Sequence, residues 1–242
     1  MKKIVVIGSC NTDMVIKANR LPVPGETVLG GTFLMNPGGK GANQAVAVAR
    51  LGGQSIFISK TGNDIFGRQS VELYNSEGIS TEHMSSDSKH PSGVALITVD
   101  SNGENCIVVA SGANAHLTPA DIEKAKDVII SSDILLMQLE IPLETVEYAT
   151  NIAVKNGVKV ILNPAPAQFL PSSIMNNIYM ITPNEVEAEI LSGIKVTDLA
   201  SAKAAAIAIS NKGVKNVVIT LGAKGGFIKE NDLFHHVSAY TV

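Results

Sequence analysis

The segment Asn36–Gly52 reads NPGGKGANQAVAVARLG and places three glycines and one lysine at the consecutive positions 38–41. Small apolar residues follow at helical spacing, which predicts a closely packed helix over Gly41–Leu51. Glycine lets the backbone approach a neighbour closely and adopt positive φ, and a helix N-terminus presents free N–H groups. We therefore expect the glycines to form a cradle for hydroxyl groups or an anion. The alternative is a tight turn whose glycines serve only helix–sheet packing.

Short, almost wholly apolar runs alternate with helical patterns on both sides of this segment. Such runs are typical of strands that a parallel sheet buries on both faces. The expected strands are Lys3–Ile7, Ser55–Ser59, Ile134–Gln138, Lys159–Leu162, Tyr179–Ile181 and Val217–Thr220. The other expected helices are Phe66–Gly78, Pro119–Ile130, Leu143–Asn156, Glu185–Leu191 and Ala200–Lys212. The alternation predicts an α/β fold, a doubly wound and mostly parallel sheet flanked by helices, in one domain over residues 1–242.

Two segments interrupt the alternation and carry no helical pattern. Residues 11–33 contain RLPVPGETVLGG, which combines a short strand with a Pro-Gly turn, and residues 93–109 read GVALITVDSNGENCIVV. The second segment is two β-rich runs joined by a hairpin signal. We expect strands from about 11–35 and 92–110 to leave the main sheet and form a small β-strand lid. The alternative is that they extend the main sheet at an edge.

The hairpin also bears an apolar row that two strands cannot bury alone. We expect this row to pair with the same lid of a second chain, which would give a two-fold homodimer. The row consists of Val94, Leu96, Ile107 and Val109.

Composition and charge exclude several classes of protein. The chain has 242 residues, of which 45% are hydrophobic, and its net charge is −3. This length can bury a sizeable core, and the charge offers no basic patch for nucleic acid or a membrane surface. The first apolar stretch, Ile4–Ile7, is too short for a signal peptide or a membrane span. Cys10 and Cys106 fit no metal spacing and suggest a reducing, cytoplasmic location.

Two common nucleotide motifs do not fit the sequence. A Walker loop requires Ser or Thr after its lysine, but Gly41 follows Lys40, and the first strand leads into GSCNTD rather than G-x-G-x-x-G. Asn11 and Asp13 come just past this strand, at the edge where open α/β sheets bind ligands. An amide and a carboxylate there can hold vicinal hydroxyls, although both residues are also ordinary turn formers.

Taken together, the motifs resemble the ribokinase group of sugar kinases, within the wider family of carbohydrate and nucleoside kinases. The motifs that carry the resemblance, in order along the whole chain, are GSCNTD, NPGGKGANQAVAVARLG, TGNDIFG, GVALI, LLMQLEIP, LNPAPA, TPNEVEAEIL and ITLGAKGG. The resemblance implies ATP-dependent phosphorylation of the 5-hydroxyl of D-ribose. It also implies Mg²⁺ and, in full-length relatives, a monovalent cation such as K⁺. A non-catalytic sugar-binding fragment and a kinase for fructose derivatives or a nucleoside remain alternatives.

The resemblance assigns individual residues to two groups. The expected sugar-binding residues are Asn11, Asp13, Gly39, Lys40, Asn43 and Glu140. The expected ATP-binding residues are Asn184, Thr220, Gly222, Lys224 and Gly225, with Glu187 acting indirectly near Mg²⁺. Simpler roles exist for several of them. Glu140 could be a helix N-terminal charge ahead of Pro142, Asn184 and Glu187 could cap a helix, and Lys224 could be a solvated loop residue.

The resemblance also implies a G-A-G-D type motif that opens a late helix and supplies an anion hole and a general-base aspartate. No Ala-Gly-Asp triplet occurs in these 242 residues, and the last of them, HHVSAYTV, resemble the strand before that motif. We therefore expect no catalytic residue here: the general base would lie beyond Val242, and this chain alone would be inactive. Asp232, in KENDLF, is expected to be a turn residue between two strands.

Overall fold

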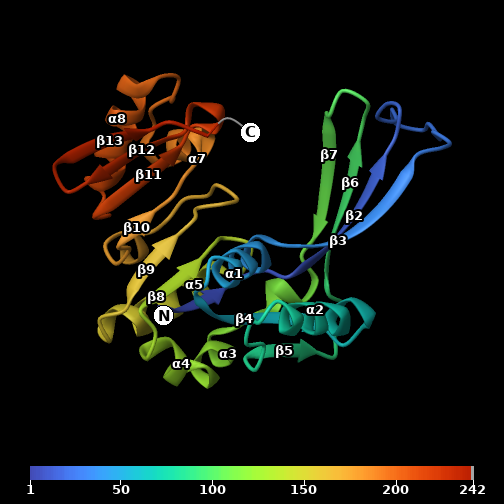
Figure 1. The fold of residues 1–242 in the computed structure, drawn as a ribbon, viewed down its shortest axis with the longest axis horizontal. Coiled ribbons are helices and arrows are strands. Elements are labelled where there is room, and N and C mark those ends of the chain that lie inside the picture. The colour runs from blue at the N-terminus through green and yellow to red at the C-terminus, as the bar shows by residue number, and fades with distance from the viewer. Residues whose placement is uncertain (241–242) are drawn as a thin grey trace.

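A computed structural model describes residues 1–240, and these residues form two separate β-sheets (Figure 1). The larger sheet has nine strands in the order β13-β12-β11-β10-β9-β8-β1-β4-β5. Its pairs from β5 to β11 are parallel, and β12 and β13 join antiparallel at one edge. The expected α/β fold with a mostly parallel main sheet is confirmed.

The strands of the main sheet lie close to the apolar runs of the sequence, and helices lie between them. Its strands are β1 (Lys3–Ile7), β4 (Gln54–Gly62), β5 (Met84–Asp87), β8 (Ile134–Met137), β9 (Lys159–Leu162), β10 (Met180–Ile181), β11 (Asn216–Thr220), β12 (Gly226–Glu230) and β13 (Leu233–Val237). The helices are α1 (Lys40–Arg50), α2 (Ile65–Ser76), α3 (Pro119–Lys124), α4 (Lys126–Ile130), α5 (Leu143–Lys155), α6 (Ser172–Met175), α7 (Glu185–Ser192) and α8 (Leu199–Ser210), with 3₁₀ turns η1 (Gly112–His116) and η2 (Gly222–Lys224).

Two details differ from the sequence-based expectation, and a third agrees with it. The helix expected over Pro119–Ile130 is interrupted at Ala125, whose φ of −102° and ψ of 12° leave the α-helical region. The short elements β5 and α6 carried no clear signal and were not expected. Asp232 lies in the turn between β12 and β13, as expected.

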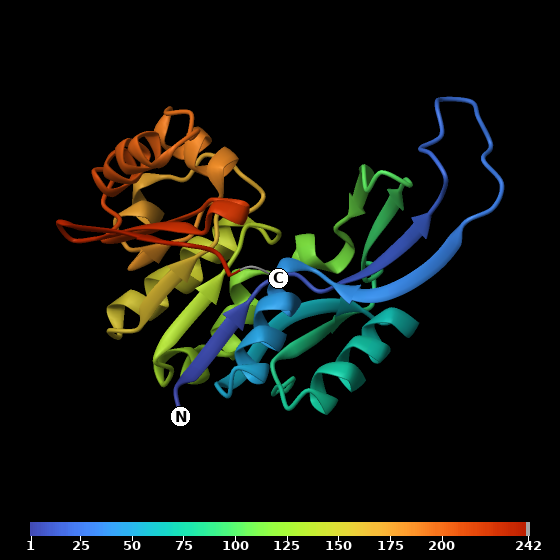
Figure 2. The same cartoon turned by 45° about the horizontal axis from the view of Figure 1, so that its top comes forward.

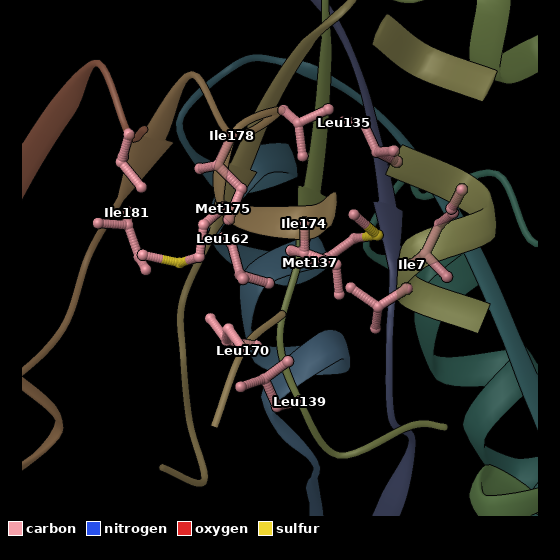
Figure 3. Close-up of a cluster of buried hydrophobic side chains, with 14 of the residues drawn as sticks. Ile7, Leu135, Met137, Leu139, Leu162, Leu170, Ile174, Met175, Ile178 and Ile181 are labelled. Atoms are coloured by element: carbon pink, nitrogen blue, oxygen red, sulfur yellow. The ribbon is translucent and has the colours of Figure 1, made fainter. Parts of the chain in front are cut away.

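The two faces of the main sheet are buried in two different cores, which explains the lack of polar alternation in its strands. Val6 of β1 packs in the core beneath α1 and α2, whereas Val5 and Ile7 belong to the larger core on the other face. The larger core includes buried residues of α3, α5 and α8, and Figure 3 shows part of it around Ile7 and Met137. Each large aliphatic side chain buried there contributes roughly 1.5–3 kcal/mol.

The smaller sheet has four strands in the order β3-β2-β6-β7 and projects away from the main sheet (Figures 1 and 2). Its strands are β2 (Asn11–Lys17), β3 (Thr32–Gly38), β6 (Gly93–Val99) and β7 (Asn105–Ala110). The expectation of a small separate β-structure is confirmed, and the alternative of an extended main sheet is wrong.

The structure corrects the expectation for the beginning of the glycine segment. Asn36–Gly38 belong to β3, paired with Asn11–Asp13 of β2, so only Gly39 separates this strand from α1. The strand accommodates Pro37 because β3 lies at the edge of its sheet, where a residue without an N–H group is tolerated.

The expected apolar row on the hairpin is also corrected. Leu96 lies opposite Val108, and Ile97 lies opposite Ile107. Because opposed residues share a face and successive residues alternate, Val94 and Leu96 face one way and Ile107 and Val109 the other. On the Leu96 face the row continues across all four strands, through Met35, Met14, Leu96 and Val108.

Candidate functional site

The glycines of the opening segment lie against the backbone at the end of β1. A Cβ atom at Gly39, whose φ is 93°, would lie 2.9 Å from the nitrogen of Asn11 and the oxygen of Ser9. A Cβ atom at Gly41 would lie 2.6 Å from the nitrogen of Ser9. Real Cβ atoms do not tolerate such distances, so only glycine lets α1 begin directly beside the first strand.

A cavity of about 580 Å³ lies at the carboxyl ends of β1 and β8. In open α/β sheets this edge binds ligands, and the volume suits a small molecule. The expected residues Asn11, Lys40, Glu140 and Glu187 all line the cavity. Val109 of the smaller sheet lines it too, so both sheets contribute to one site.

Glu140 joins the end of β8 to the first turn of α1. Its Oε2 accepts hydrogen bonds from the backbone nitrogen of Lys40 at 3.0 Å and from Oγ of Ser9 at 2.5 Å. Its Oε1 lies 3.6 Å from Nζ of Lys40. A carboxylate is favoured at a helix N-terminus, but these bonds are made to α1 rather than to the helix after Pro142. The simpler role we considered for Glu140 therefore concerns the wrong helix.

Asp13 borders this site from β2 and is only partly exposed. Burial raises the pKa of its carboxyl group, the nearby Glu140 raises it further, and Lys40 opposes both effects. Two carboxylates and one ammonium group thus act on each other at this edge of the cavity. Opposing charges and partial burial of this kind are typical of ligand sites.

The remaining expected sugar-binding residues lie near the cavity without lining it. Asn43 is exposed on α1, and Gly39 precedes that helix. Neither belongs to the residues that bound the 580 Å³ volume. The structure therefore brings Asn11, Lys40 and Glu140 together directly, with Asp13 beside them.

Asn114, in η1, is a cavity residue that the sequence analysis missed. Its amide bonds to the backbone of Cys10 and to the side chain of Asn11. Asn114 is separated from Asn11 by 103 positions along the chain. The only signal was a polar residue between the last strand of the smaller sheet and the next helix, which is common in loops.

Asn184 and Glu187 form a reciprocal cap at the start of α7. Oδ1 of Asn184 accepts from the nitrogen of Glu187 at 2.8 Å, and Oε2 of Glu187 accepts from the nitrogen of Asn184 at 2.9 Å. This is a capping box, so the simpler role that we considered for these two residues, capping a helix, is present. Glu187 also lines the cavity, so capping does not remove it from the site.

A second cavity, of about 480 Å³, lies beside η2. Lys224 is exposed and lines this cavity, and its Nζ lies 3.3 Å from the carbonyl oxygen of Thr197. Gly222 and Gly225 bound the turn with φ of 55° and 92°. A Cβ atom at Gly225 would lie 1.9 Å from the carbonyl oxygen of Val237, which requires glycine there.

Thr220 ends β11, and its nitrogen donates to the carbonyl oxygen of Pro183 at 2.9 Å. This bond places Thr220 beside Asn184, its partner in an isolated β-bridge. Of the expected nucleotide residues only Lys224 lines the second cavity, and the other four are sequence neighbours of residues that line it.

The whole chain, residues 1–242, matches the family model described as pfkB family carbohydrate kinase. The chain belongs to the pfkB family of carbohydrate kinases. It is 47% identical over 241 residues to ribokinase of Haemophilus influenzae, covering all of this chain and 79% of that protein. It is 39% identical over 240 residues to deoxyribokinase of Salmonella typhi, covering 99% of this chain and 78% of that protein.

The fold of this pfkB-family chain also matches solved structures. Arabidopsis thaliana ribokinase complexed with ribose and ATP superimposes with a TM-score of 0.91 at 29% identity. The match covers 98% of this chain and 78% of that chain. The resemblance inferred from the motifs is thereby confirmed at the level of a ribokinase-related sugar kinase.

Within residues 1–240, no three His, Cys, Asp or Glu side chains are grouped as metal ligands. Mg²⁺ commonly keeps its waters and takes one or two carboxylates plus substrate phosphates, so Glu187 fits it without such a group. None of the helices in the described part is long and apolar enough to span a membrane.

Proposed function

We propose that this chain binds D-ribose in the 580 Å³ cavity and supplies the sugar and nucleotide sites of a protein that phosphorylates the ribose 5-hydroxyl with ATP. The observation that supports this most is the convergence of Asn11, Lys40 and Glu140 on one cavity at the carboxyl edge of the sheet. Amide and carboxylate groups are the partners that sugar hydroxyls require, because each hydroxyl both donates and accepts.

In this proposal Glu140 and Asp13 accept hydrogen bonds from sugar hydroxyls, and the side-chain amide of Asn11 also bonds to them. Gly39 and Asn43, beside the cavity, contact the sugar at its margin. Catalysis of phosphoryl transfer consists mainly of positioning and charge stabilisation. These residues would therefore fix the sugar in position for transfer to its 5-hydroxyl.

The second cavity fits a nucleotide beside the sugar, because α7 borders both volumes. Glu187 lines the first cavity and Glu185 the second, two residues apart on that helix. Lys224 would meet the phosphates of ATP, with Asn184, Thr220, Gly222 and Gly225 along the nucleotide. Glu187 would act on Mg²⁺ through water, and the bound ion would neutralise phosphate charge. The K⁺ implied by full-length relatives has no assigned ligand among these residues.

The four-stranded sheet would serve as the lid of this site and as the contact for a homodimer. Val109 already faces the cavity, while Leu96 on the opposite face is 57% exposed. A lid excludes water from the transferring group, and a shared apolar face can hold two copies together. Both roles belong to the proposal.

The substrate is tested by titrating the purified chain calorimetrically with D-ribose, 2-deoxy-D-ribose, fructose and adenosine. We expect ribose to bind most tightly. Tighter binding of 2-deoxy-D-ribose would make the chain a deoxyribokinase, a second candidate that the Salmonella relative supports. Preference for fructose or adenosine would overturn the proposal. Binding of ribose without turnover in any longer form would favour a sugar-binding protein.

A further inference from the structure

We propose that Asn114 is a positioning residue, which holds the side-chain amide of Asn11 with its NH₂ group directed into the 580 Å³ cavity. A ligand hydroxyl must then accept a hydrogen bond at this point. The inference rests on the proposed sugar site and adds to it the direction of one hydrogen bond and the residue that fixes it.

The orientation of the Asn114 amide is determined by main-chain groups. Its Oδ1 accepts from the backbone nitrogen of Cys10 at 2.9 Å, and its Nδ2 donates to the carbonyl oxygen of Cys10 at 3.1 Å. A backbone N–H can only donate and a backbone C=O can only accept. The Asn114 amide therefore has one permitted orientation, and its Nδ2 is the atom that remains for Asn11.

This orientation in turn fixes the amide of Asn11. Nδ2 of Asn114 donates to Oδ1 of Asn11 at 2.7 Å. If the Asn11 amide were turned over, two NH₂ groups would face each other in a buried position, where an unmade hydrogen bond is costly. Asn114 is 1% exposed and Asn11 is 5% exposed, so water offers no substitute partner.

The NH₂ group of Asn11 is left for a ligand. Within residues 1–240, no hydrogen bond uses Nδ2 of Asn11, and the only fully buried side-chain atom without a partner is Oε1 of Gln138. Nδ2 of Asn11 therefore reaches open space, and Asn11 lines the cavity. The side-chain oxygen Oδ1 of Asn11 already accepts a hydrogen bond from Asn114. The group that Asn11 offers to the cavity is therefore its NH₂ donor.

The structure also reserves space for this amide pair. A Cβ atom at Gly93 would lie 2.1 Å from Oδ1 of Asn11 and 2.3 Å from Nδ2 of Asn114. Gly93 begins β6 and pairs with Asn11, the first residue of β2. Glycine at this position thus allows two strands of the smaller sheet and η1 to meet at the bonded amides.

The neighbouring groups of the site have the opposite polarity. Ionised Glu140 and Asp13 can only accept, whereas the outward group of Asn11 can only donate. A hydroxyl that donates to a carboxylate and accepts from Asn11 satisfies both. The arrangement therefore favours ligands with hydroxyl groups, and Asn114 contributes to this preference without touching the ligand.

A double-mutant cycle tests the inference. D-ribose affinity is measured calorimetrically for the wild-type chain, Asn11→Ala, Asn114→Ala and the double variant. We expect Asn114→Ala to weaken binding about tenfold, the value of one aligned hydrogen bond. In the Asn11→Ala background the same substitution should weaken binding no further. Asn114→Asp, which keeps the acceptor for Cys10 but loses the donor, should resemble Asn114→Ala.

Asn216→Ala is the matched control, since Asn216 is also buried and its Nδ2 donates to the backbone oxygen of Tyr179 at 2.9 Å, far from the cavity. It should lower the melting temperature without changing ribose affinity. Equal losses of affinity in Asn114→Ala and Asn216→Ala, or a full further loss in the Asn11→Ala background, would show a merely structural role and overturn the inference.

A second measurement separates this inference from the proposed substrate. In the free, ¹⁵N-labelled chain, the side-chain NH₂ of Asn114 should exchange slowly with water, and its signal should move in Asn11→Ala. If no sugar binds the wild-type chain, the proposed function fails, but these signals still test the amide pair. Rapid exchange of the Asn114 NH₂ would overturn the pair whatever ligand the cavity takes.

Discussion

A Cβ atom at Gly38 would lie 2.2 Å from the carboxylate of Asp13, on the neighbouring strand of the four-stranded sheet. The carboxylate of Asp13 can therefore occupy this position only because Gly38 has no side chain. We expect Gly38→Ala to displace Asp13 and weaken ribose binding about tenfold or more, because a charged hydrogen bond is lost. Calorimetry with ribose measures the effect.

Gly226→Ala is the control for this prediction. A Cβ atom at Gly226 would approach no atom closer than 3.6 Å, which is an ordinary contact. Its ribose affinity should equal that of the wild type. Unchanged affinity in Gly38→Ala would mean that Asp13 does not bind the sugar.

We expect Asp13→Asn to weaken ribose binding more than Lys224→Ala. A carboxylate paired with sugar hydroxyls makes bonds of roughly 1.5–3 kcal/mol each, whereas Lys224 lies in the other cavity. Calorimetry decides between the two variants, and a larger loss in Lys224→Ala would contradict the proposed sugar site.

The same carboxyl group gives ribose affinity a pH dependence. Burial and Glu140 raise the pKa of Asp13 above its ordinary value of 3.8. Only the ionised group accepts from two hydroxyls, so affinity should begin to fall at a higher pH than for an ordinary aspartate, as acidification protonates Asp13. Asp13→Asn should lack this part of the dependence. If the ribose affinity of the wild type and of Asp13→Asn had the same pH dependence, a group other than Asp13 would cause it.

The main sheet could be predicted from sequence because its strands are buried on both faces. Val5 and Ile7 are buried in one core and Val6 in the other. A strand buried on both faces has apolar residues at successive positions, which the sequence shows as an unbroken apolar run. The smaller sheet was harder to predict in detail. Its register places Leu96 opposite Val108, and which residues share a face depends on pairing that a single strand does not encode.

The residues of the candidate site could likewise be predicted only in part. Motifs that follow strand ends indicated Asn11 and Glu140, because a strand end fixes where a side chain lies. Asn114 was missed because its role depends on an amide 103 positions away. We expected the glycine segment to form a cradle or a tight turn before the helix, because proline and glycine are usual turn signals. Its start, Asn36–Gly38, is a strand only through pairing with β2.

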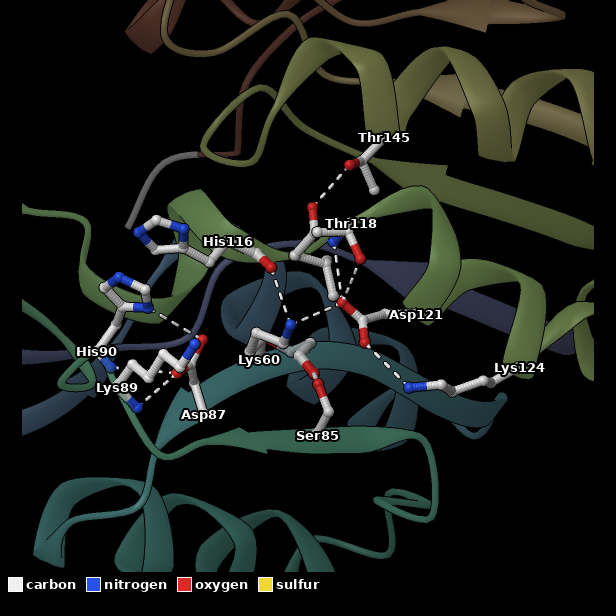
Figure 4. A network of polar contacts seen from close by, with 12 residues as sticks. Lys60, Ser85, Asp87, Lys89, His90, His116, Thr118, Asp121, Lys124 and Thr145 are labelled. Carbon is white, nitrogen blue, oxygen red and sulfur yellow. Dashed lines mark hydrogen bonds and ion pairs between the residues drawn. The ribbon is translucent and has the colours of Figure 1, made fainter.

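An ion pair between β4 and α3 should stabilise the fold near the base of the smaller sheet (Figure 4). Lys60 and Asp121 are 2.7 Å apart, with side chains 13% and 11% exposed. Burial alone would raise the pKa of Asp121, but hydrogen bonds from Lys60 and Thr118 outweigh it and bring the pKa to about 2. We expect Asp121→Asn to lower the free energy of unfolding by about 2 kcal/mol at neutral pH.

The pH dependence of this effect has a definite sign. A lowered carboxyl pKa stabilises the folded state above the ordinary value of 3.8, and the contribution is lost as the pH falls toward about 2. Urea unfolding of the wild type and of Asp121→Asn should therefore show a difference in the free energy of unfolding at pH 7 and little difference at pH 2. A difference that persists at pH 2 would point to packing rather than charge.

The exposed face of the smaller sheet should hold two copies of the chain together. We expect Leu96→Asp to give monomers in analytical ultracentrifugation, because it places a charge in the middle of the row shared with Met14, Met35 and Val108. Leu51→Asp is the control, since Leu51 is also exposed but lies at the C-cap of α1, outside the smaller sheet. A wild-type chain that stays monomeric at high concentration would contradict the proposed dimer.

The last prediction concerns turnover by a polypeptide of residues 1–242 alone. Phosphoryl transfer needs a base at the attacking hydroxyl and groups that hold the phosphoryl in line. In our proposal Asp13 and Glu140 are committed to the sugar and Glu187 caps α7. Residues 1–242 also contain no Ala-Gly-Asp motif of the kind that the resemblance implies for the base. We therefore expect ribose binding with ATP turnover at background in a coupled assay.

Adding the remaining segment of the Haemophilus ribokinase, of which this chain spans 79%, should restore turnover. Val237 is 53% exposed, so the longer form should also be more soluble, because an added segment can cover apolar strand surface there. We expect the same of the apolar residue Val242, which lies outside the described residues. Asp232→Asn should leave the longer form fully active, because Asp232 occupies a hairpin turn. If a 242-residue polypeptide of verified mass phosphorylates ribose at an enzyme's usual rate of about 1–100 s⁻¹, the base lies within these residues.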